Sequence, residues 1–155
     1  MITTKGRYAL RVMIDLAEHE DKRSVPLKDI AERQDISKKY LEIIMKDLVK
    51  SGLVTGISGK GGGYRLTRTS ENYFVGEILE VMEGSLAPVA CLQCNAAPCK
   101  RESFCKTLPL WKEFNQITHD FFYSKTLKEL LGGDGNFEAQ PEPSPQTEIE
   151  PLQNN

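Results

Sequence analysis

Apolar residues recur every three or four positions through the first fifty residues, which is the spacing of one face of an α-helix. The pattern predicts a first helix over about residues 6–20. It predicts a second helix with Pro26 at its first helical position, where no backbone N–H is needed. The inward face of the first helix would carry Ala9, Val12, Met13, Leu16 and Ala17, and its outward face Arg7, Arg11, Asp15 and Glu18.

A third helix is predicted over about residues 38–51. Ser37 is its expected N-cap, because the hydroxyl can accept a hydrogen bond from an unpaired N–H, and Gly52 is its expected stop. Its buried stripe would be Leu41, Ile44, Met45 and Leu48, and its outer face Lys39, Glu42, Ile43, Lys46 and Lys50. Two short helices, a tight turn and a third helix with a basic outer face are typical of a helix-turn-helix DNA-binding domain.

A short hairpin is predicted directly after this third helix. Residues 53–58 and 64–66 read as strands on either side of a glycine-rich turn at 59–63. A hairpin in this place is typical of a wing, with Lys60 at its tip. A nucleotide-phosphate loop is disfavoured, because Lys60 is followed by Gly61 rather than Ser or Thr, and then by a strand rather than a helix. The predicted fold class is therefore mainly α with a small β-wing.

Two further helices are predicted over about residues 75–82 and 109–123. The longer one has a broad apolar face made of Leu110, Trp111, Phe114, Ile117, Thr118, Phe121 and Phe122. We expect part of this face to pack onto the first helix and the rest to form a dimer seam, because large exposed apolar patches are rare in monomers. A capping box at Thr126 and Glu129 opens a last short helix.

Charge is unevenly placed along the chain. Five of the 22 acidic residues and none of the 20 basic ones lie in residues 134–155, which leaves a net charge of +3 for the preceding part. Residues 132–155 are polar, acidic and Pro-rich, and are expected to be disordered. Residues 33–68 hold eight basic and three acidic side chains. A local basic patch favours a polyanion partner, although a solvated basic face would show the same composition.

The sequence contains no long apolar run, and its first five residues have no apolar leader segment, so we expect a cytoplasmic protein without a membrane span. The cytosol keeps thiols reduced, which favours clustered cysteines as metal ligands over disulfides. An enzyme is not expected, because the two His residues are scattered and no nucleophile constellation accompanies them.

All four cysteines fall within fifteen residues, as C-x2-C-x4-C-x5-C, at Cys91, Cys94, Cys99 and Cys105. Soft thiolates suit iron–sulfur clusters, zinc and copper(I). Structural zinc usually uses two pairs separated by a dozen or more residues, so one continuous loop favours a cluster over zinc. Free or redox-active thiols are the remaining alternative.

These features together resemble the IscR-type family of winged helix-turn-helix regulators. The likeness rests on residues 4–9, 27–42, 59–64 and 75–78 and on spaced cysteines followed by Trp111, and it covers about residues 1–131. It implies a dimeric bacterial transcription regulator that binds double-stranded DNA. Several members hold a two-iron or four-iron cluster in the loop before the dimer helix, and others sense through a thiol or a partner protein. We expect a homodimer whose DNA binding is controlled by a cluster, with a two-iron form favoured over a four-iron form and zinc as a lesser possibility. A cluster-free repressor is the alternative.

The resemblance also implies functional residues. Cys91, Cys99 and Cys105 take the three cluster-ligand positions. The fourth ligand is a His in the founding type and a carboxylate in the nitric-oxide-sensing branch, and the matching places here are Leu108 and Tyr8. Cys94 is then the simplest fourth ligand, with an exogenous thiol or a residue of the other subunit as alternatives.

In the DNA-binding head, the start of the third helix is expected in the major groove. The expected contacts on the DNA are Lys5, Arg7, Ser37, Lys38, Lys39, Tyr40, Glu42, Lys60 and Arg65. Glu42 can accept a hydrogen bond from cytosine N4, whereas Lys5, Arg7, Lys60 and Arg65 are expected to hold phosphates. The founding type has an Arg before the glycine-rich turn where this chain has Ser58, so the operator preference of this protein is expected to differ.

The expected domain division is a DNA-binding head at 1–83, a cluster loop at 84–106, dimerisation helices at 107–131 and a tail at 132–155.

Overall fold

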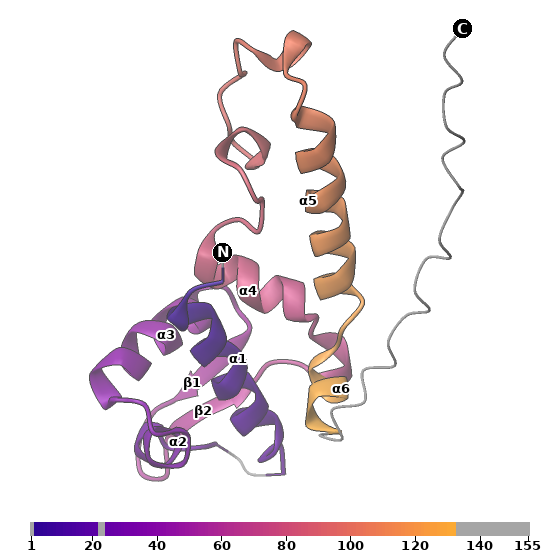
Figure 1. Ribbon diagram of the computed structural model, residues 1–155. Coiled ribbons are helices and arrows are strands. Elements are labelled where there is room, and N and C mark those ends of the chain that lie inside the picture. Colours follow the sequence, from indigo (N-terminus) through magenta and orange to yellow (C-terminus); the bar gives the residue numbers. More distant parts are fainter. Residues whose placement is uncertain (1, 22–23, 133–155) are drawn as a thin grey trace, which may run out of the picture.

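The computed structural model describes residues 2–21 and 24–132, which form a helical head and a long helix that projects from it (Figure 1). The elements of the head are α1 (Thr4–Ala17), α2 (Leu27–Gln34), α3 (Lys38–Lys50), β1 (Val54–Ile57) and β2 (Gly63–Leu66). They are followed by η1 (Ser70–Asn72), α4 (Val75–Glu83), η2 (Ala90–Leu92), η3 (Glu102–Phe104), α5 (Leu108–Tyr123) and α6 (Leu127–Leu131). The predicted fold class, mainly α with a small β-wing, is confirmed. The predicted tail lies outside the described residues except for Gly132.

Helix α1 is shorter than the sequence predicts. Thr3 is its N-cap and accepts a hydrogen bond from the N–H of Gly6. The helix ends at Ala17 rather than near Glu20, because the N–H groups of His19 and Glu20 bond to the carbonyls three residues back, which closes the end as a tighter turn.

The boundaries of α2 and α3 follow from capping. Pro26 is the N-cap of α2 in an extended conformation, so the prediction that it is the first helical residue is wrong by one position. Ser37 caps α3 as predicted, since its side chain accepts from the N–H of Tyr40 at 3.3 Å. Gly52 has a φ of +76°, the left-handed conformation in which glycine ends a helix at least cost.

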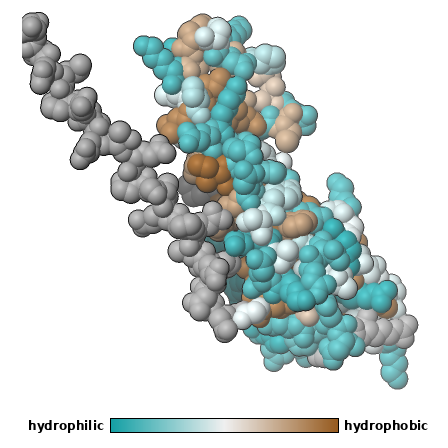
Figure 2. Space-filling model, turned by 90° about the vertical axis from the view of Figure 1, so that its right-hand side faces the viewer, coloured by the Kyte–Doolittle hydropathy of each residue, from teal (hydrophilic) through white to brown (hydrophobic). Residues whose placement is uncertain are grey.

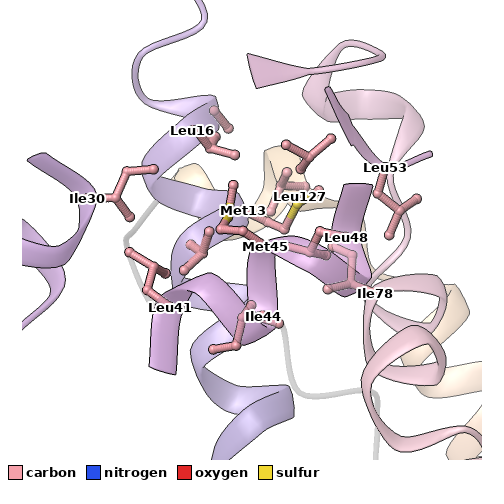
Figure 3. Packing of buried hydrophobic residues seen from close by; sticks show 14 of the residues in the cluster. Met13, Leu16, Ile30, Leu41, Ile44, Met45, Leu48, Leu53, Ile78 and Leu127 are labelled. Carbon is pink, nitrogen blue, oxygen red and sulfur yellow. The ribbon is translucent and has the colours of Figure 1, made fainter. Parts of the chain in front are cut away.

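The core lies between α1, α3 and α4, with α2, β1 and α6 closing its sides (Figure 3). The predicted buried stripes of α1 and α3 are confirmed, since their members are between 0% and 7% exposed. Tyr73 was not predicted as a core residue, yet its ring is fully buried. Its hydroxyl donates to the carbonyl of Leu53 and accepts from the N–H groups of Thr67 and Arg68, which fixes the chain between the wing and α4.

Asp15 corrects the predicted polar face of the first helix, because its side chain is completely buried. Arg33 of α2 donates to both carboxylate oxygens, at 2.7 and 2.9 Å, and the side-chain amide of Gln34 donates to one of them at 3.0 Å. Burial alone would raise the pKa of Asp15, but these donors and the charge of Arg33 outweigh it and hold the pKa below its ordinary value. The carboxylate therefore fastens α2 to α1.

The wing is an antiparallel pair in which Val54 faces Leu66 and Ile57 faces Gly63. Val25 extends the pairing, because it exchanges two backbone hydrogen bonds of 2.8 Å with Tyr64. A Cβ on Gly63 would lie 2.3 Å from the carbonyl oxygen of Val25, so a side chain there would break this junction. The base of the wing is thus tied to the segment just before α2.

Helix α5 packs on α4, whereas α1 packs on α4 and α6, so the expectation that α5 packs onto the first helix is wrong. Gly76 on α4 makes the close approach possible: a Cβ there would lie 2.4 Å from the ring of Tyr123. The hydroxyl of Tyr123 donates to Glu80 at 2.7 Å. Burial and this bond raise the pKa of Tyr123 to about 12. The predicted capping box of Thr126 and Glu129 is present at the start of α6.

Candidate DNA interface and cysteine cavity

The outer face of α3 is free of the core. Every residue of this face is exposed, and even its apolar residue Ile43 is 48% exposed. Its residues are Lys38, Lys39, Glu42, Ile43, Lys46 and Lys50. The carboxylate of Glu42 has no hydrogen bond or ion pair within the described chain. This face can therefore enter a groove without unpacking the head.

The Tyr40 side chain is half-buried, so it is only partly accessible to DNA. Its ring packs edge-on against Tyr8 of α1 with the centroids 5.8 Å apart, and the Arg11 guanidinium lies over the Tyr8 ring at 5.2 Å. Arg11 also donates to the side chain and to the carbonyl of Gln34. Tyr40 therefore has a packing role at the start of α3, and its ring edge and hydroxyl are what remains for a partner.

The expected phosphate-binding residues differ in what they already contact. The ammonium of Lys5 donates to Asp47 of α3 at 2.6 Å, so a phosphate would have to share or displace that carboxylate. Arg7 is exposed and donates to Thr4 one turn earlier. Lys60 is exposed at the wing tip, where Gly59 and Gly61 have φ of +96° and +77°. Arg65 is exposed on β2 opposite Thr55.

A cavity of about 210 Å³ lies inside the loop between α4 and α5. Cys91, Cys99 and Cys105 line it, together with Leu92, Ala96, Ala97, Pro98, Glu102 and Leu108. Cys91 and Cys99 are exposed and Cys105 is half-buried. The three cysteines that the resemblance assigned as ligands thus line one cavity, which is large enough for more than a single water, although their sulfurs do not all lie within 4.8 Å of one another.

Cys94 is placed differently. It is exposed at the tip of a turn that is closed by a 3.0 Å hydrogen bond from the N–H of Ala96 to the carbonyl of Gln93. It does not line the cavity of the other three cysteines. Its role as fourth ligand stays a prediction.

Cys105 sits in the most favourable place for a thiolate. The Thr107 hydroxyl lies 3.5 Å from its sulfur, and this contact, helped by backbone donors and the charge of Arg101, lowers the pKa of the Cys105 thiol. A thiolate is the form that binds metal. A second group of potential ligands, Asp15, Glu18 and His19, lies elsewhere in the described chain, but Arg33 already occupies both oxygens of Asp15.

Helix α5 presents an apolar face to solvent. Within α5, all of whose residues are described, none is buried, and the exposed apolar residues are Leu110 (58%), Phe114 (50%), Ile117 (59%) and Phe121 (54%). Figure 2 shows the corresponding side of the molecule, with apolar surface in brown gathered in the upper half of the view, over α5. The spacing of four, three and four residues is that of a helix seam.

The sequence did not identify the polar contacts that join α4 to α1 and to α5. Glu83, the last residue of α4, accepts from the N–H and the hydroxyl of Thr3 at 3.0 and 2.9 Å, so α4 caps the start of α1. Tyr123 and Glu80 join α5 to α4. Acidic residues on an amphipathic helix read as solvated from sequence alone, and no local pattern gives their distant partners.

The described residues contain no helix of the length and apolarity that a membrane crossing needs.

Comparison with known proteins identifies the family. The family model Rrf2, described as an iron-dependent transcriptional regulator, matches residues 2–133. The HTH-type transcriptional regulator IscR of Vibrio campbellii is 38% identical over 130 residues, which cover 84% of this chain and 76% of that protein. IscR of Vibrio cholerae is 40% identical over 131 residues, with 84% and 74% covered.

Comparison with solved structures points to the same kind of regulator. CymR (YrzC), the global cysteine regulator of B. subtilis, is 35% identical with a TM-score of 0.69, and the match covers 85% of this chain and 96% of that one. T. potens IscR is 34% identical with a TM-score of 0.69, covering 85% and 86%. The oxidized form of Staphylococcus aureus CymR is 32% identical with a TM-score of 0.64, covering 84% and 95%. The chain is a winged-helix DNA-binding transcription regulator, not an enzyme, and it belongs to the Rrf2 family.

Proposed function

We propose that this protein is a cytoplasmic, dimeric regulator whose affinity for promoter DNA is set by an iron–sulfur cluster bound in the loop of residues 84–106. The observation that carries the proposal is the convergence of Cys91, Cys99 and Cys105 on one cavity beside the first turn of α5. The head is formed by residues 1–83, and the dimer is made by residues 107–131.

The cavity fits such a group by its chemistry. Thiolates are the donors that iron–sulfur clusters use, and the small side chains of Ala96 and Ala97 leave room between the sulfurs. Lys100 and Arg101 are positioned in the same loop to offset the negative charge of several thiolates. When bound, a cluster supplies a centre that responds to electrons and small reactive molecules. One continuous loop with gaps of four and five residues favours a two-iron cluster over zinc, whose structural sites usually use two separated pairs, and zinc is the lesser possibility.

The DNA-binding surface is proposed to be the outer face of α3 with the wing. Ser37, Lys38, Lys39, Tyr40 and Glu42 lie at the start of α3, which enters the major groove in helix-turn-helix proteins. Glu42 is proposed to read a base, while Arg7, Lys60 and Arg65 contact phosphates. Lys5 joins them only if its bond to Asp47 is shared.

The second copy of this chain is proposed to cover the apolar face of α5. Leu110, Phe114, Ile117 and Phe121 repeat at coiled-coil spacing and are all at least half exposed. Isologous pairing of this face would bury it on both copies and place two heads for two half-sites.

A continuous series of contacts can carry a change from the loop to α3. The loop ends at the first turn of α5, and Tyr123 near its other end contacts Gly76 and Glu80 of α4. Glu83 of α4 holds Thr3 at the start of α1. Lys5, in the first turn of α1, donates to Asp47 of α3. A shift of α5 is thus coupled to the recognition helix through polar contacts as well as packing.

Purification without oxygen tests the proposal. We expect iron and acid-labile sulfide with a visible charge-transfer spectrum. We also expect different affinities of the loaded and stripped protein for duplexes selected from a random-sequence pool. Affinity should fall steeply with salt, because phosphate contacts release counterions. Protein that contains neither iron nor sulfide and binds DNA unchanged by their supply would contradict the cluster role.

The exposure of Cys91, Cys94 and Cys99 favours a second candidate, a cluster-free regulator that senses through its thiols. The likeness to CymR, one structure of which is an oxidized form, points the same way. In that case oxygen-free protein is colourless, and a thiol oxidant alone changes DNA affinity. The spectrum of the oxygen-free protein separates the two candidates.

A further inference from the structure

The turn between Cys99 and Cys105 places a carboxylate beside the cavity-lining cysteines. The N–H of Glu102 donates to the carbonyl of Cys99 at 3.0 Å, and its own carbonyl accepts from the N–H of Cys105 at 3.3 Å. Glu102 opens the short 3₁₀ turn η3, which ends just before Cys105. Cys99, Glu102 and Cys105 are spaced by three, and all of them line the cavity.

Cys94 is less well placed for the same cavity. It lies at the exposed tip of the turn from Gln93 to Ala96, and the lining of the cavity does not include it. Glu102 lines the cavity, and its backbone hydrogen bonds to Cys99 and Cys105 hold it between two of the cavity-lining cysteines.

We propose that Glu102 supplies the fourth ligand to the cluster, with Cys91, Cys99 and Cys105 as the other three, an assignment that rests on the cluster-binding function proposed above. Carboxylate oxygen is an established iron ligand, and one iron of a two-iron cluster can carry ligands other than thiolate. Oxygen is a harder donor than sulfur, so the iron that Glu102 holds is the more exchangeable of the two. The Glu102 side chain is 59% exposed, which keeps that iron accessible to small molecules.

The same carboxylate also connects the loop to α5. The ammonium of Lys112, in the second turn of α5, lies 4.0 Å from Glu102. When the carboxylate leaves the iron it keeps a cationic partner on α5, and when it binds the iron that partner is released or shared. Ligand exchange at Glu102 therefore changes a contact of the helix that carries the proposed dimer face.

The test compares single variants of the full-length protein purified without oxygen. Glu102→Gln keeps the size of the side chain and removes its charge, Glu102→Cys offers a thiolate, and Cys94→Ser removes the competing ligand. Glu113→Gln, an exposed carboxylate of α5 outside the cavity lining, is the matched control. Readouts are iron and sulfide per chain, resistance of the cluster to a chelator, and midpoint potential.

Glu102→Gln should lose iron to the chelator at least about tenfold faster than the wild type, since loss of a ligand costs no less than loss of its supporting shell. Glu102→Cys should keep the cluster, because thiolate is a cluster ligand, and should shift its midpoint potential because the identity of one ligand changes. Cys94→Ser and Glu113→Gln should match the wild type.

Loss of the cluster in Cys94→Ser with retention in Glu102→Gln would overturn the assignment. So would a Glu102→Gln protein that equals the wild type in both chelator resistance and potential. These results differ from failure of the proposed function, in which the wild type itself contains no iron or sulfide.

Discussion

Single side chains fix the geometry of the head at positions that look ordinary in the sequence. Asp15 joins α1 to α2 from a fully buried position, and Tyr73 uses its hydroxyl to organise the chain that leaves the wing. Because buried polar groups are costly when a partner is lost, these residues matter more to the orientation of α3 than their type suggests.

Asp15→Asn should lower the free energy of unfolding by about 2 kcal/mol, at the low end for a buried ion pair because the Arg33 side chain is 34% exposed and can reach water. Urea unfolding measures the change. Glu32→Gln, which removes an exposed carboxylate from α2, is the control and should change it little.

The same contact gives a pH dependence. The pKa of Asp15 in the folded protein lies below its ordinary value of 3.8, so its contribution is complete above that value and is lost as pH falls through the lower folded-state pKa. Urea unfolding of the wild type should therefore show a steeper loss of stability below pH 3.8 than the Asp15→Asn protein. Parallel curves for the two proteins would contradict this account.

Glu42→Ala tests base reading on the outer face of α3. An exposed carboxylate with no partner in a basic face repels phosphate, so its removal should leave total DNA affinity equal or higher while preference at one base pair falls by about 1–3 kcal/mol. Binding to a panel of single-base variants of a selected duplex measures both. A uniform loss across the panel would instead mark Glu42 as a structural residue.

At the scale of elements, α5 is unusual because it meets the rest of the described chain mainly through α4. α5 can pack on α4 only because Gly76 has no side chain there. Four large apolar residues of α5 are exposed to water. A helix arranged in this way is stable as part of a larger assembly, which is why the proposed dimer and the stability of α5 belong together.

Ile117→Lys should shift the protein toward a monomer, because it places a charge in the middle of the exposed apolar seam. Sedimentation equilibrium gives the dissociation constant, which should rise at least about tenfold, the equivalent of 1.4 kcal/mol. Gln116→Lys adds the same charge one residue away, on the polar face next to Asp120, and should leave assembly unchanged. Equal weakening by both variants would point away from this seam.

Periodicity was enough to predict the elements, and it failed where partners are distant in sequence. The stripes of α1 and α3, the cap at Ser37 and the capping box at Thr126 all depend on neighbours within one turn, and these were confirmed. Asp15 was assigned to the surface because its partner Arg33 lies eighteen residues away. The packing of α5 on α4 depended in the same way on Gly76 and Tyr123, which only the fold brings together.

The candidate site was likewise predicted only in part from the sequence. Spacing and resemblance placed Cys91, Cys99 and Cys105 together, and all three line the cavity. They could not show that Cys94, on its own turn, does not line this cavity, nor that Glu102 does. Loop conformation depends on backbone hydrogen bonds that residue types alone do not specify.

At the scale of the whole molecule, α4 stands between α5 and the head that contains α1 and α3 (Figure 1). One of its ends contacts Thr3 through Glu83, and its middle contacts Tyr123 through Gly76 and Glu80. Two sites joined through one packed helix can influence each other only as far as the contacts of that helix differ between states.

Glu83→Ala should weaken this influence. It removes two hydrogen bonds to Thr3, which costs about 1–2 kcal/mol of unfolding free energy, and the ratio of DNA affinities between loaded and stripped protein should move several-fold toward one. Glu113→Ala on the polar face of α5 serves as the control. An unchanged ratio in the Glu83 variant would place the coupling elsewhere.

The loop between α4 and α5 lies beside the end of α5 that is remote from α3 (Figure 1). Cys91 and Cys99, which line the cavity in this loop, are exposed to solvent. If the proposed function holds, a regulator bound to its promoter would keep these cysteines in contact with the surrounding medium. A diffusing oxidant could then react with them before the protein dissociates. The time needed to switch a gene would be set by the reaction at the sulfurs, so tight DNA binding and a rapid response would be compatible in one molecule.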